Sequence, residues 1–345
     1  MKPLASLSLD LDNEWSYLKT HGDKRWESLP SYMGVLVPRV LEILEQMKLR
    51  ITFFVVGQDA ALEKNREPFA RLGASHHEIG SHSFRHEPWF HLYSPEEVDR
   101  ELAQTEEAIE GATGRRVRGF RGPGFSVSET TLRALVQRGY RYDASTLPTF
   151  IGPLARAYYF MTAKLDPAER DKRAHLFGDM RDALRPIRPY CWQLDGAEVR
   201  ADTRSNGASL DGGGSRLLEI PVTTFPGLRV PIHASYVLYL SCFSPPAASV
   251  YFKSALAACR ALGVEPSILL HPLDFLGRDD VSGGLSFFPA MQLSREVKLQ
   301  RIGRYLGILA RYFEIIPLGQ HAEAIEARPE VRVIAPRFRS EIARG

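Results

Sequence analysis

Two acidic residues and two histidines form the pattern in this sequence that is best suited to chemistry. Asp10 and Asp12 are separated by one residue, and His82 and His86 are separated by three. Carboxylate oxygens and imidazole nitrogens are common ligands of zinc in proteins. Two histidines and one aspartate leave a coordination position open for water, and a second carboxylate beside them can accept a proton. The set therefore predicts metal-dependent hydrolysis of an unreactive bond.

The two aspartates lie in a segment that alternates between leucine and polar residues from position 7 to position 12. A period of two is that of a β-strand, which places Asp10 and Asp12 on one face, about 7 Å apart at about 3.3 Å per residue. Like charges this close repel, so a nearby cation would stabilise both. Taken alone, this spacing favours an acidic strand end in solvent, because surface carboxylates are common.

The two histidines change that interpretation. His82 and His86 are four positions apart, so one helical turn would point both the same way. They follow Glu78-Ile79-Gly80, which is typical of the end of a short strand. A histidine pair is a weak motif by itself. Together with an aspartate it makes a three-ligand set, which is typical of catalytic rather than structural zinc.

Composition limits the classes of protein that this chain can belong to. Its 345 residues suffice for one large α/β domain or two small ones, and 44% of them are hydrophobic. A net charge of +3 is too small to indicate nucleic acid as the main partner. The cysteines are few and unclustered, which favours a reducing compartment over a zinc ribbon: Cys191, Cys242 and Cys259.

Two segments bear on the predicted location of the protein: its N-terminus and its longest apolar region. The first strand begins within a few residues of Met1, which leaves no room for a cleaved signal peptide. The apolar region 230–258 is interrupted by Pro245, Pro246 and Lys253, so we do not expect it to span a membrane. We expect a cytoplasmic protein, with the inner surface of the membrane as an alternative location.

Strand and helix patterns alternate along the chain. Apolar runs predict buried strands at 51–56, 117–120, 217–222, 268–270 and 313–317. Amphipathic patterns predict further helices, at 33–47, 247–262 and 293–311. Two more helices have start signals: a capping box opens one at Ser94 and Pro95, and Ser128 precedes the other, at 129–138.

Repeated strand–helix units imply an α/β fold with a mostly parallel sheet. About seven strands favour a closed or nearly closed barrel over an open doubly wound sheet. No glycine-rich phosphate loop follows the first strand, which argues against a dinucleotide site. We expect one barrel domain over 1–328, an insertion at about 150–216 and a C-terminal tail at 329–345. A small accessory domain is the alternative for the insertion.

Three further polar residues follow predicted strands. Arg121 comes after 117–120, where it can pair with a carboxylate such as Asp10. Asp143 follows another short strand, and His271 directly follows 268–270. Each has an ordinary structural alternative, such as a surface arginine before a turn. Barrel enzymes build their sites at the carboxyl ends of their strands, so the clustering of such residues there favours a catalytic site.

With these segments in order, the sequence resembles the polysaccharide deacetylases of carbohydrate esterase family 4, which carry the NodB homology domain. The matching segments are 8–12, 82–86, 121–124, 143–148 and 270–272. The resemblance implies a distorted (β/α)7–8 barrel and metal-dependent removal of an acyl group from an N-acylated sugar. By position, Asp12, His82 and His86 resemble the metal ligands, with Zn²⁺ the expected ion, and Asp10 resembles the general base.

The same resemblance implies roles for the residues that follow the later strands. Arg121 matches the arginine that orients the base, and His271 matches the general acid. Asp143 is expected to hold His271. The sequence departs from many members at Leu11, which separates two aspartates that are adjacent in those members. Some members with smaller or non-polymeric substrates look like this chain, so the departure puts the substrate class in question.

Three functions remain open from the sequence. The leading hypothesis is an N-deacetylase that acts on a cell-surface glycan precursor or a lipid-linked saccharide. The second is a hydrolase of a non-sugar amide, such as a cyclic ureide or imide, and the third is a non-catalytic glycan-binding barrel. The apolar segment 230–252 further suggests peripheral contact with a bilayer, with an ordinary buried segment as the alternative.

Overall fold

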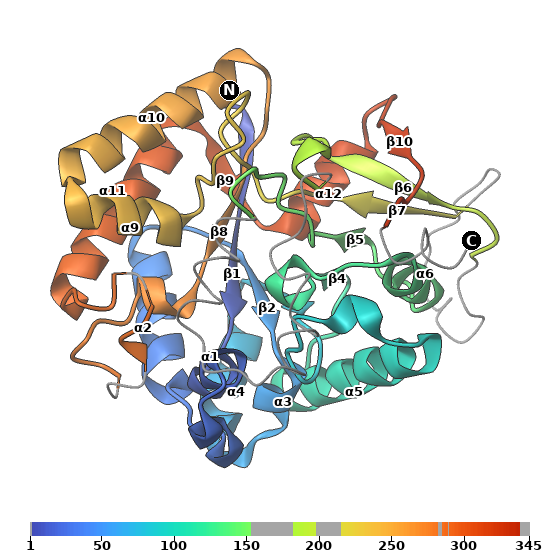
Figure 1. Cartoon of the computed structure of the whole chain (residues 1–345), viewed down its shortest axis with the longest axis horizontal. Helices are drawn as coiled ribbons and strands as arrows, with labels where there is room; N and C mark the ends of the chain where they lie inside the picture. Colours follow the sequence, from blue (N-terminus) through green and yellow to red (C-terminus); the bar gives the residue numbers. More distant parts are fainter. Residues whose placement is uncertain (1, 153–181, 198–214, 282–284, 289, 339–345) are drawn as a thin grey trace.

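The computed structural model describes residues 2–152, 182–197, 215–281, 285–288 and 290–338 (Figure 1). Within these residues the strands are β1 Leu4–Leu11, β2 Thr52–Val55, β3 Glu78–Ser81, β4 Gly119–Phe120, β5 Tyr142–Asp143, β6 Tyr190–Leu194, β7 Ser215–Glu219, β8 Ser267–Leu270, β9 Glu314–Ile316 and β10 Val333–Ile334. Their order in the sheet is β10-β6-β7-β5-β4-β3-β2-β1-β8, and β9 pairs with β1. The neighbours are parallel except β6 and β7, which are antiparallel. The predicted α/β fold with a mostly parallel sheet is confirmed.

Backbone contacts beyond these strands bring the sheet close to a closed barrel. After β7 the chain continues to Thr223, whose amide donates to the Ser267 carbonyl of β8 at 2.9 Å. The Ser267 amide donates back to Thr223 Oγ1 at 2.8 Å. These two bonds connect the ends of a ring made of β1, β2, β3, β4, β5, β7 and β8. The predicted nearly closed barrel is therefore present, and β6, β9 and β10 lie outside its ring.

Helices follow most of the barrel strands (Figure 1). They are α1 Glu14–His21, α2 Met33–Gln46, α3 Gly57–Ala61, α4 Arg66–Ala74, α5 Pro95–Thr113, α6 Glu129–Gln137, α9 Ala234–Phe243, α10 Pro245–Ala261, α11 Arg295–Tyr312 and α12 Leu318–Glu326. The predicted capping box is confirmed, since Ser94 Oγ accepts from the Glu97 amide and Glu97 Oε2 accepts from the Ser94 amide. Ser128 likewise caps α6 by accepting from the Thr131 amide. None of the described helices is long and apolar enough to cross a bilayer.

The described ends of the predicted insertion and tail take part in the sheet. Strand β6 comes from the predicted insertion, and its residues Tyr190, Trp192 and Leu194 are buried on one face. Strand β10, from the predicted tail, pairs with β6. Residues 153–181 and 198–214, which make up most of the predicted insertion, lie outside the described part of the chain. The domain boundaries at 150–216 and 329–345 stay predictions.

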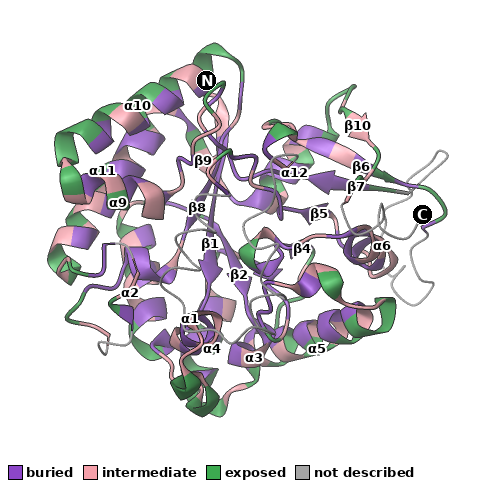
Figure 2. Cartoon of the chain, viewed as in Figure 1, coloured by how far each residue is buried: buried purple, intermediate pink, exposed green. Residues whose placement is uncertain are grey.

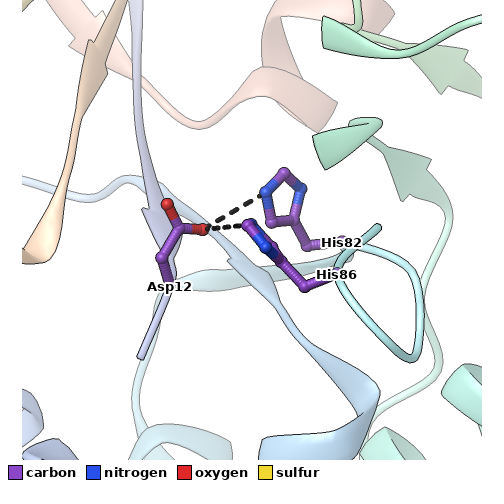
Figure 3. A group of neighbouring side chains, drawn as sticks. All are labelled: Asp12, His82 and His86. Carbon is purple, nitrogen blue, oxygen red and sulfur yellow. Dashed lines mark hydrogen bonds and ion pairs between the residues drawn. The ribbon is translucent and has the colours of Figure 1, made fainter. Parts of the chain in front are cut away.

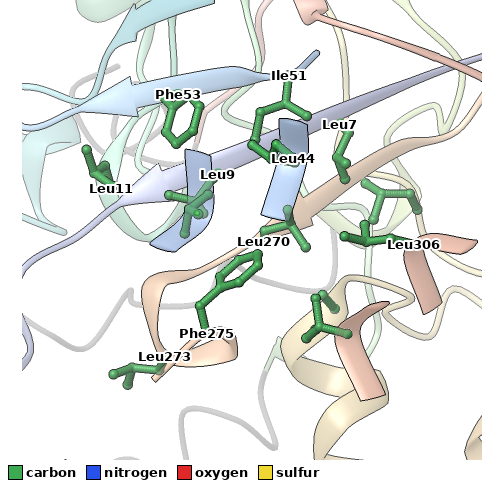
Figure 4. Packing of buried hydrophobic residues seen from close by; sticks show 14 of the residues in the cluster. Leu7, Leu9, Leu11, Leu44, Ile51, Phe53, Leu270, Leu273, Phe275 and Leu306 are labelled. Atoms are coloured by element: carbon green, nitrogen blue, oxygen red, sulfur yellow. The ribbon is translucent and has the colours of Figure 1, made fainter. Parts of the chain in front are cut away.

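Strand β1 lies at the centre of both the core and the site. Leu7, Leu9 and Leu11 are fully buried and face a cluster that includes Phe53 and Leu270 (Figure 4). The pleat turns the alternate residues of β1 to the opposite face, toward the barrel interior. The leucine stripe thus fixes the orientation of the strand that carries the aspartates.

Truncation of this stripe should destabilise the whole fold. Leu9→Ala removes a fully buried side chain, and we expect it to lower the free energy of unfolding by about 3 kcal/mol. Urea denaturation followed by circular dichroism measures this loss. The exposed Leu184→Ala is the control, and it should change the stability by less than about 0.5 kcal/mol. An unchanged urea midpoint for Leu9→Ala would contradict the central place of β1 in the core.

Candidate metal and catalytic site

The site forms where the carboxyl ends of neighbouring parallel strands meet. Asp10 is the second-last residue of β1, and Asp12 directly follows that strand. His82 directly follows β3, which β2 separates from β1 in the sheet. Because all three strands are parallel, these residues reach the same end of the barrel. The parallel sheet therefore brings Asp10, Asp12 and His82 to one end of the barrel.

The loop between the two histidines is held by a buried acid from α5. One oxygen of Glu101, Oε2, accepts from the amides of Phe84 and Arg85, both at 3.0 Å. Ser83 and His86 both have left-handed backbones, with φ of 59° and 53°. Such a conformation is rare outside glycine and costs free energy, so the surrounding contacts must enforce it. The result is a loop that folds back on itself, not the helical turn inferred from the spacing.

This loop brings both imidazoles to one oxygen of Asp12 (Figure 3). Asp12 Oδ1 lies 3.0 Å from His86 Nε2 and 3.3 Å from His82 Nε2. One ligand atom from each of the three residues lies within 4.8 Å of the others, and all three side chains are buried. Two nitrogens and one carboxylate oxygen in this arrangement suit a divalent ion with an open position.

Further contacts of His82 and Asp12 favour the binding of a cation. His82 Nδ1 lies 2.6 Å from the Arg121 carbonyl oxygen, which requires the proton to be on Nδ1 and leaves Nε2 free as a ligand. Burial opposes ionisation of Asp12, yet the histidine contacts hold the pKa of Asp12 well below its usual range. The carboxylate is thus anionic near neutral pH. Both properties fit a bound metal ion.

Asp10 faces Arg121 across the barrel interior. Arg121 follows β4, and its Nη1 donates to Asp10 Oδ1 at 2.7 Å and to Ser8 Oγ at 2.8 Å. Its Nε donates to the Ala144 carbonyl at 2.9 Å, and its guanidinium lies 4.4 Å from the centre of the Phe54 ring. The guanidinium therefore orients the Asp10 carboxylate. The pairing of Arg121 with Asp10 that the sequence suggested is present.

His271 directly follows β8, and a serine of α9 contacts its ring. Nδ1 of His271 lies 2.9 Å from Ser235 Oγ, in the first turn of α9. The His271 amide donates to Asp274 Oδ2 at 2.8 Å. The His233 ring lies edge-on against the His271 ring, with 5.9 Å between their centres. Sequence patterns singled out none of these three neighbours.

Asp143 does not hold His271 as expected. Its Oδ1 accepts from the Ala144 amide at 2.9 Å and from Ser145 Oγ at 2.5 Å. Asp143 is also the register partner of Glu219 on β7. Burial, with the facing Glu219 carboxylate, raises the pKa of Asp143 well above its usual value. The structure thus places Asp143 in the wall of the barrel, where Ser145 in turn accepts from the Gly122 amide.

Comparisons with known proteins bear on this geometry. A sequence model described as polysaccharide deacetylase matches residues 29–142. The chain is 28% identical over 151 residues to a peptidoglycan deacetylase of Helicobacter pylori, covering 42% of this chain and 50% of that protein. It therefore spans about half the length of that curated relative.

The fold is similar to that of a Mycobacterium smegmatis crystal structure assigned to the polysaccharide deacetylases. The TM-score is 0.60 at 19% identity, with 98% of this chain and 95% of that chain covered. At this identity the similarity concerns the fold alone. It extends over almost the whole chain, including β1 and β8, which lie outside the matched region 29–142.

Removal of one imidazole should abolish tight metal binding. We expect His82→Ala to weaken zinc binding by at least about 100-fold, because a ligand is lost and not only an outer contact. Isothermal titration of chelator-treated protein with Zn²⁺ measures this change. His76→Ala is the matched control, since His76 is exposed just before β3. Equal zinc affinity in the native protein and in His82→Ala would contradict the ligand assignment.

Proposed function

We propose that this chain, a member of the polysaccharide deacetylase family, is a metal-dependent hydrolase that removes an N-acetyl group from a sugar. The proposal rests on one observation: three candidate metal ligands and a separate carboxylate lie together at one end of the barrel. Asp12, His82 and His86 converge on one point, and Asp10, which lies on β1 two residues before Asp12, pairs with Arg121. The family match supports the amide substrate.

Each residue of the site has a defined task in such a hydrolysis. Asp12, His82 and His86 would hold the ion, which lowers the pKa of a water molecule and polarises an acyl carbonyl when bound. Asp10 accepts a proton from the attacking water. Arg121 keeps the Asp10 side chain directed into the barrel through its 2.7 Å hydrogen bond. The His271 imidazolium donates a proton to the departing amine, which is otherwise a poor leaving group.

The proposed activity is tested by acetate release with Zn²⁺ present. The substrates are polymeric, oligomeric and lipid-linked N-acetyl sugars, together with cyclic ureides and imides. We expect release from the sugars, and Asp10→Asn should lower kcat by about 10²- to 10⁴-fold because the proton acceptor is lost. Zinc affinity should change little, since Asp10 lies outside the group of three candidate ligands and pairs with Arg121. The exposed Asp195→Asn serves as the control.

Each outcome of this screen bears on a particular hypothesis. Full activity of Asp10→Asn would remove Asp10 from the chemistry. Preferred hydrolysis of ureides or imides would change the substrate class and keep the hydrolase. Tight zinc binding without hydrolysis of any substrate would favour the non-catalytic glycan-binding barrel.

We further propose that the substrate is attached to a lipid and that α9 rests on the membrane surface beside it. Residues 230–252 contain no charged side chain. On this segment Phe243 is 73% exposed and packs edge-on against Tyr239, with 5.2 Å between the ring centres. Val250, on α10, is exposed as well, and Figure 2 shows further exposed residues along α10. Exposed aromatic and aliphatic side chains without charges favour the boundary between headgroups and acyl chains.

The neighbouring helices carry charges that suit anionic lipids. The charged residues of α10 and α11 are basic except Glu296. The exposed basic residues are Lys253, Arg260, Arg295, Arg304 and Arg311, whereas Lys298 is buried. Arg301 also donates to the Ser241 carbonyl, which ties α11 to α9. Because Ser235 of α9 contacts His271, a docked α9 would bring the site close to the headgroups. A cytoplasmic location is part of this proposal, and the free thiols of Cys191, Cys242 and Cys259 agree with it.

Vesicle sedimentation tests the membrane contact independently of activity. The protein should sediment with phosphatidylglycerol-containing vesicles and less with pure phosphatidylcholine, because the basic helices add electrostatic attraction. The double variant Tyr239→Ser, Phe243→Ser should weaken sedimentation by about tenfold. Leu184→Ser removes an equally exposed apolar side chain outside α9 and α10, and it should have no effect. Recovery of the native protein entirely in the supernatant would refute the contact.

A further inference from the structure

Asp59 on α3 is a buried acid that the proposed hydrolysis does not use. Its side chain has no exposed surface, and its Oδ1 accepts from Asn13 Nδ2 at 2.6 Å and from Trp15 Nε1 at 2.9 Å. Asn13 directly follows the candidate ligand Asp12, and Trp15 lies in the first turn of α1. The hydrogen bonds of this acid therefore end on the chain that leaves the metal site.

We propose that Asp59 is a positioning residue for the metal site, and that it fixes, through Asn13, the segment that carries Asp12. This inference rests on the proposed function for the role of Asp12, His82 and His86 as metal ligands. Asp59 acts only through other residues, since it lies outside the group of three candidate ligands. Outer contacts of this kind orient the ligands of a metal and raise its affinity.

The Asn13 side chain makes every hydrogen bond that a primary amide can make. Its Nδ2 donates to Asp59 and also to Ser31 Oγ, the latter at 2.8 Å. Its Oδ1 accepts from the backbone amides of Glu14 at 2.8 Å and of Tyr32 at 3.1 Å. Rotation of this fully buried side chain would break four hydrogen bonds at once. The amide is therefore held in one orientation.

The same cluster reaches the backbone of the ligand Asp12. The Tyr32 amide bonds to Asn13, and the Tyr32 hydroxyl donates to the Asp12 carbonyl at 2.6 Å in a buried contact. The peptide group that joins Asp12 to Asn13 is thus held at its oxygen. Pairing within β1 fixes the backbone just before Asp12. Only the side-chain torsions of Asp12 then remain to be set by its contacts with the imidazoles.

The helix that carries Asp59 also holds the loop between the two histidines. At the start of α3 the Gly57 amide donates to the Ser83 carbonyl at 2.9 Å. The Gln58 amide donates to the Phe84 carbonyl at 3.0 Å. Glycine permits this approach, because a Cβ at position 57 would lie 2.7 Å from Phe84 Cδ2. Helix α3 follows β2, which lies between β1 and β3 in the sheet, so it bridges the two segments that carry the ligands.

The link through Asp59 does not depend on the protonation of its carboxyl group. Burial raises the pKa of Asp59 to about 7, although the hydrogen bonds from Asn13 and Trp15 oppose this rise. Oδ1 accepts both of these bonds, and Oδ2 is buried without a hydrogen-bond partner among the described residues. A proton on Oδ2 would leave Oδ1 able to accept from Asn13. The geometry of the acceptor, and not its charge, should therefore decide the position of Asp12.

Titration of chelator-treated full-length protein with Zn²⁺ tests the positioning role. Asp59→Ala removes the acceptor for Asn13, and we expect it to weaken zinc binding by about 10- to 100-fold. Asp59→Asn keeps an oxygen in the place of Oδ1 and should bind zinc nearly as tightly as the native protein. Rescue by this conservative variant distinguishes the acceptor from the charge.

A matched control and a spectrum separate positioning from a loss of stability. Glu219 is also fully buried and accepts from a tryptophan, Trp192 Nε1 at 3.1 Å, but its other bonds go to Thr146. Glu219→Ala should lower the urea midpoint and leave zinc affinity unchanged. The visible absorption of bound Co²⁺ reports its coordination geometry. At saturating Co²⁺, Asp59→Ala should change the shape of this spectrum, whereas partial unfolding would only reduce its intensity.

The outcomes separate the positioning role from the proposed function. Equal zinc affinity in the native protein and in Asp59→Ala overturns the positioning role, whatever the acetate assay shows. If Asp59→Ala does not fold, Asn13→Ser breaks the same link and keeps a capping oxygen for α1, and unchanged zinc affinity in that variant overturns the role equally. Weakened zinc binding and an altered cobalt spectrum, in a protein that releases no acetate, support the role and refute the deacetylase function. A native protein that binds no zinc refutes both.

Discussion

The structure depends on one guanidinium that lies wholly inside the barrel. Arg121 has no exposed surface, and its donors reach the side chains of Ser8 and Asp10 on β1 and the Ala144 carbonyl beyond β5. A buried charge is costly unless it is paired and hydrogen-bonded. The strands around it must therefore be spaced to supply acceptors. The same residue presents its carbonyl to His82, so Asp10 and one candidate metal ligand are positioned together.

Hydrophobic packing and polar placement are linked through the period of β1. Its leucines are buried in the helical layer, and the alternate residues face Arg121. A shift by one residue would turn the leucines toward Arg121 in the barrel interior and place the polar residues in the apolar layer. The core thus selects the register that makes the site, and parallel pairing with β2 and β8 fixes it.

Local sequence patterns predicted the features that depend mainly on neighbouring residues. The alternation at β1, the capping box at Ser94 and the order of strands and helices all appear in the structure. The convergence of Asp12, His82 and His86 was also predicted, because parallel strands bring their carboxyl ends together. The predicted contact between Asp143 and His271 was wrong. Ser235 lies 36 residues before His271, on a helix that carries no motif, and only tertiary packing brings the two side chains together. Strand β10 could not be predicted from the sequence for a similar reason, because it is two residues long and forms by pairing with β6.

The pairing of β1 has a consequence for how the protein matures. Leu4 pairs with Glu314, and Leu9 pairs with Leu270, so β1 leaves the ribosome long before its partners β8 and β9. Contacts this distant in sequence are slow to form. The nascent chain therefore holds Asp10 and Asp12 in an incomplete barrel until β8 and β9 have been synthesised. A polypeptide cut short before β8 would keep both histidines and yet lack the neighbour that locks its acidic strand in place.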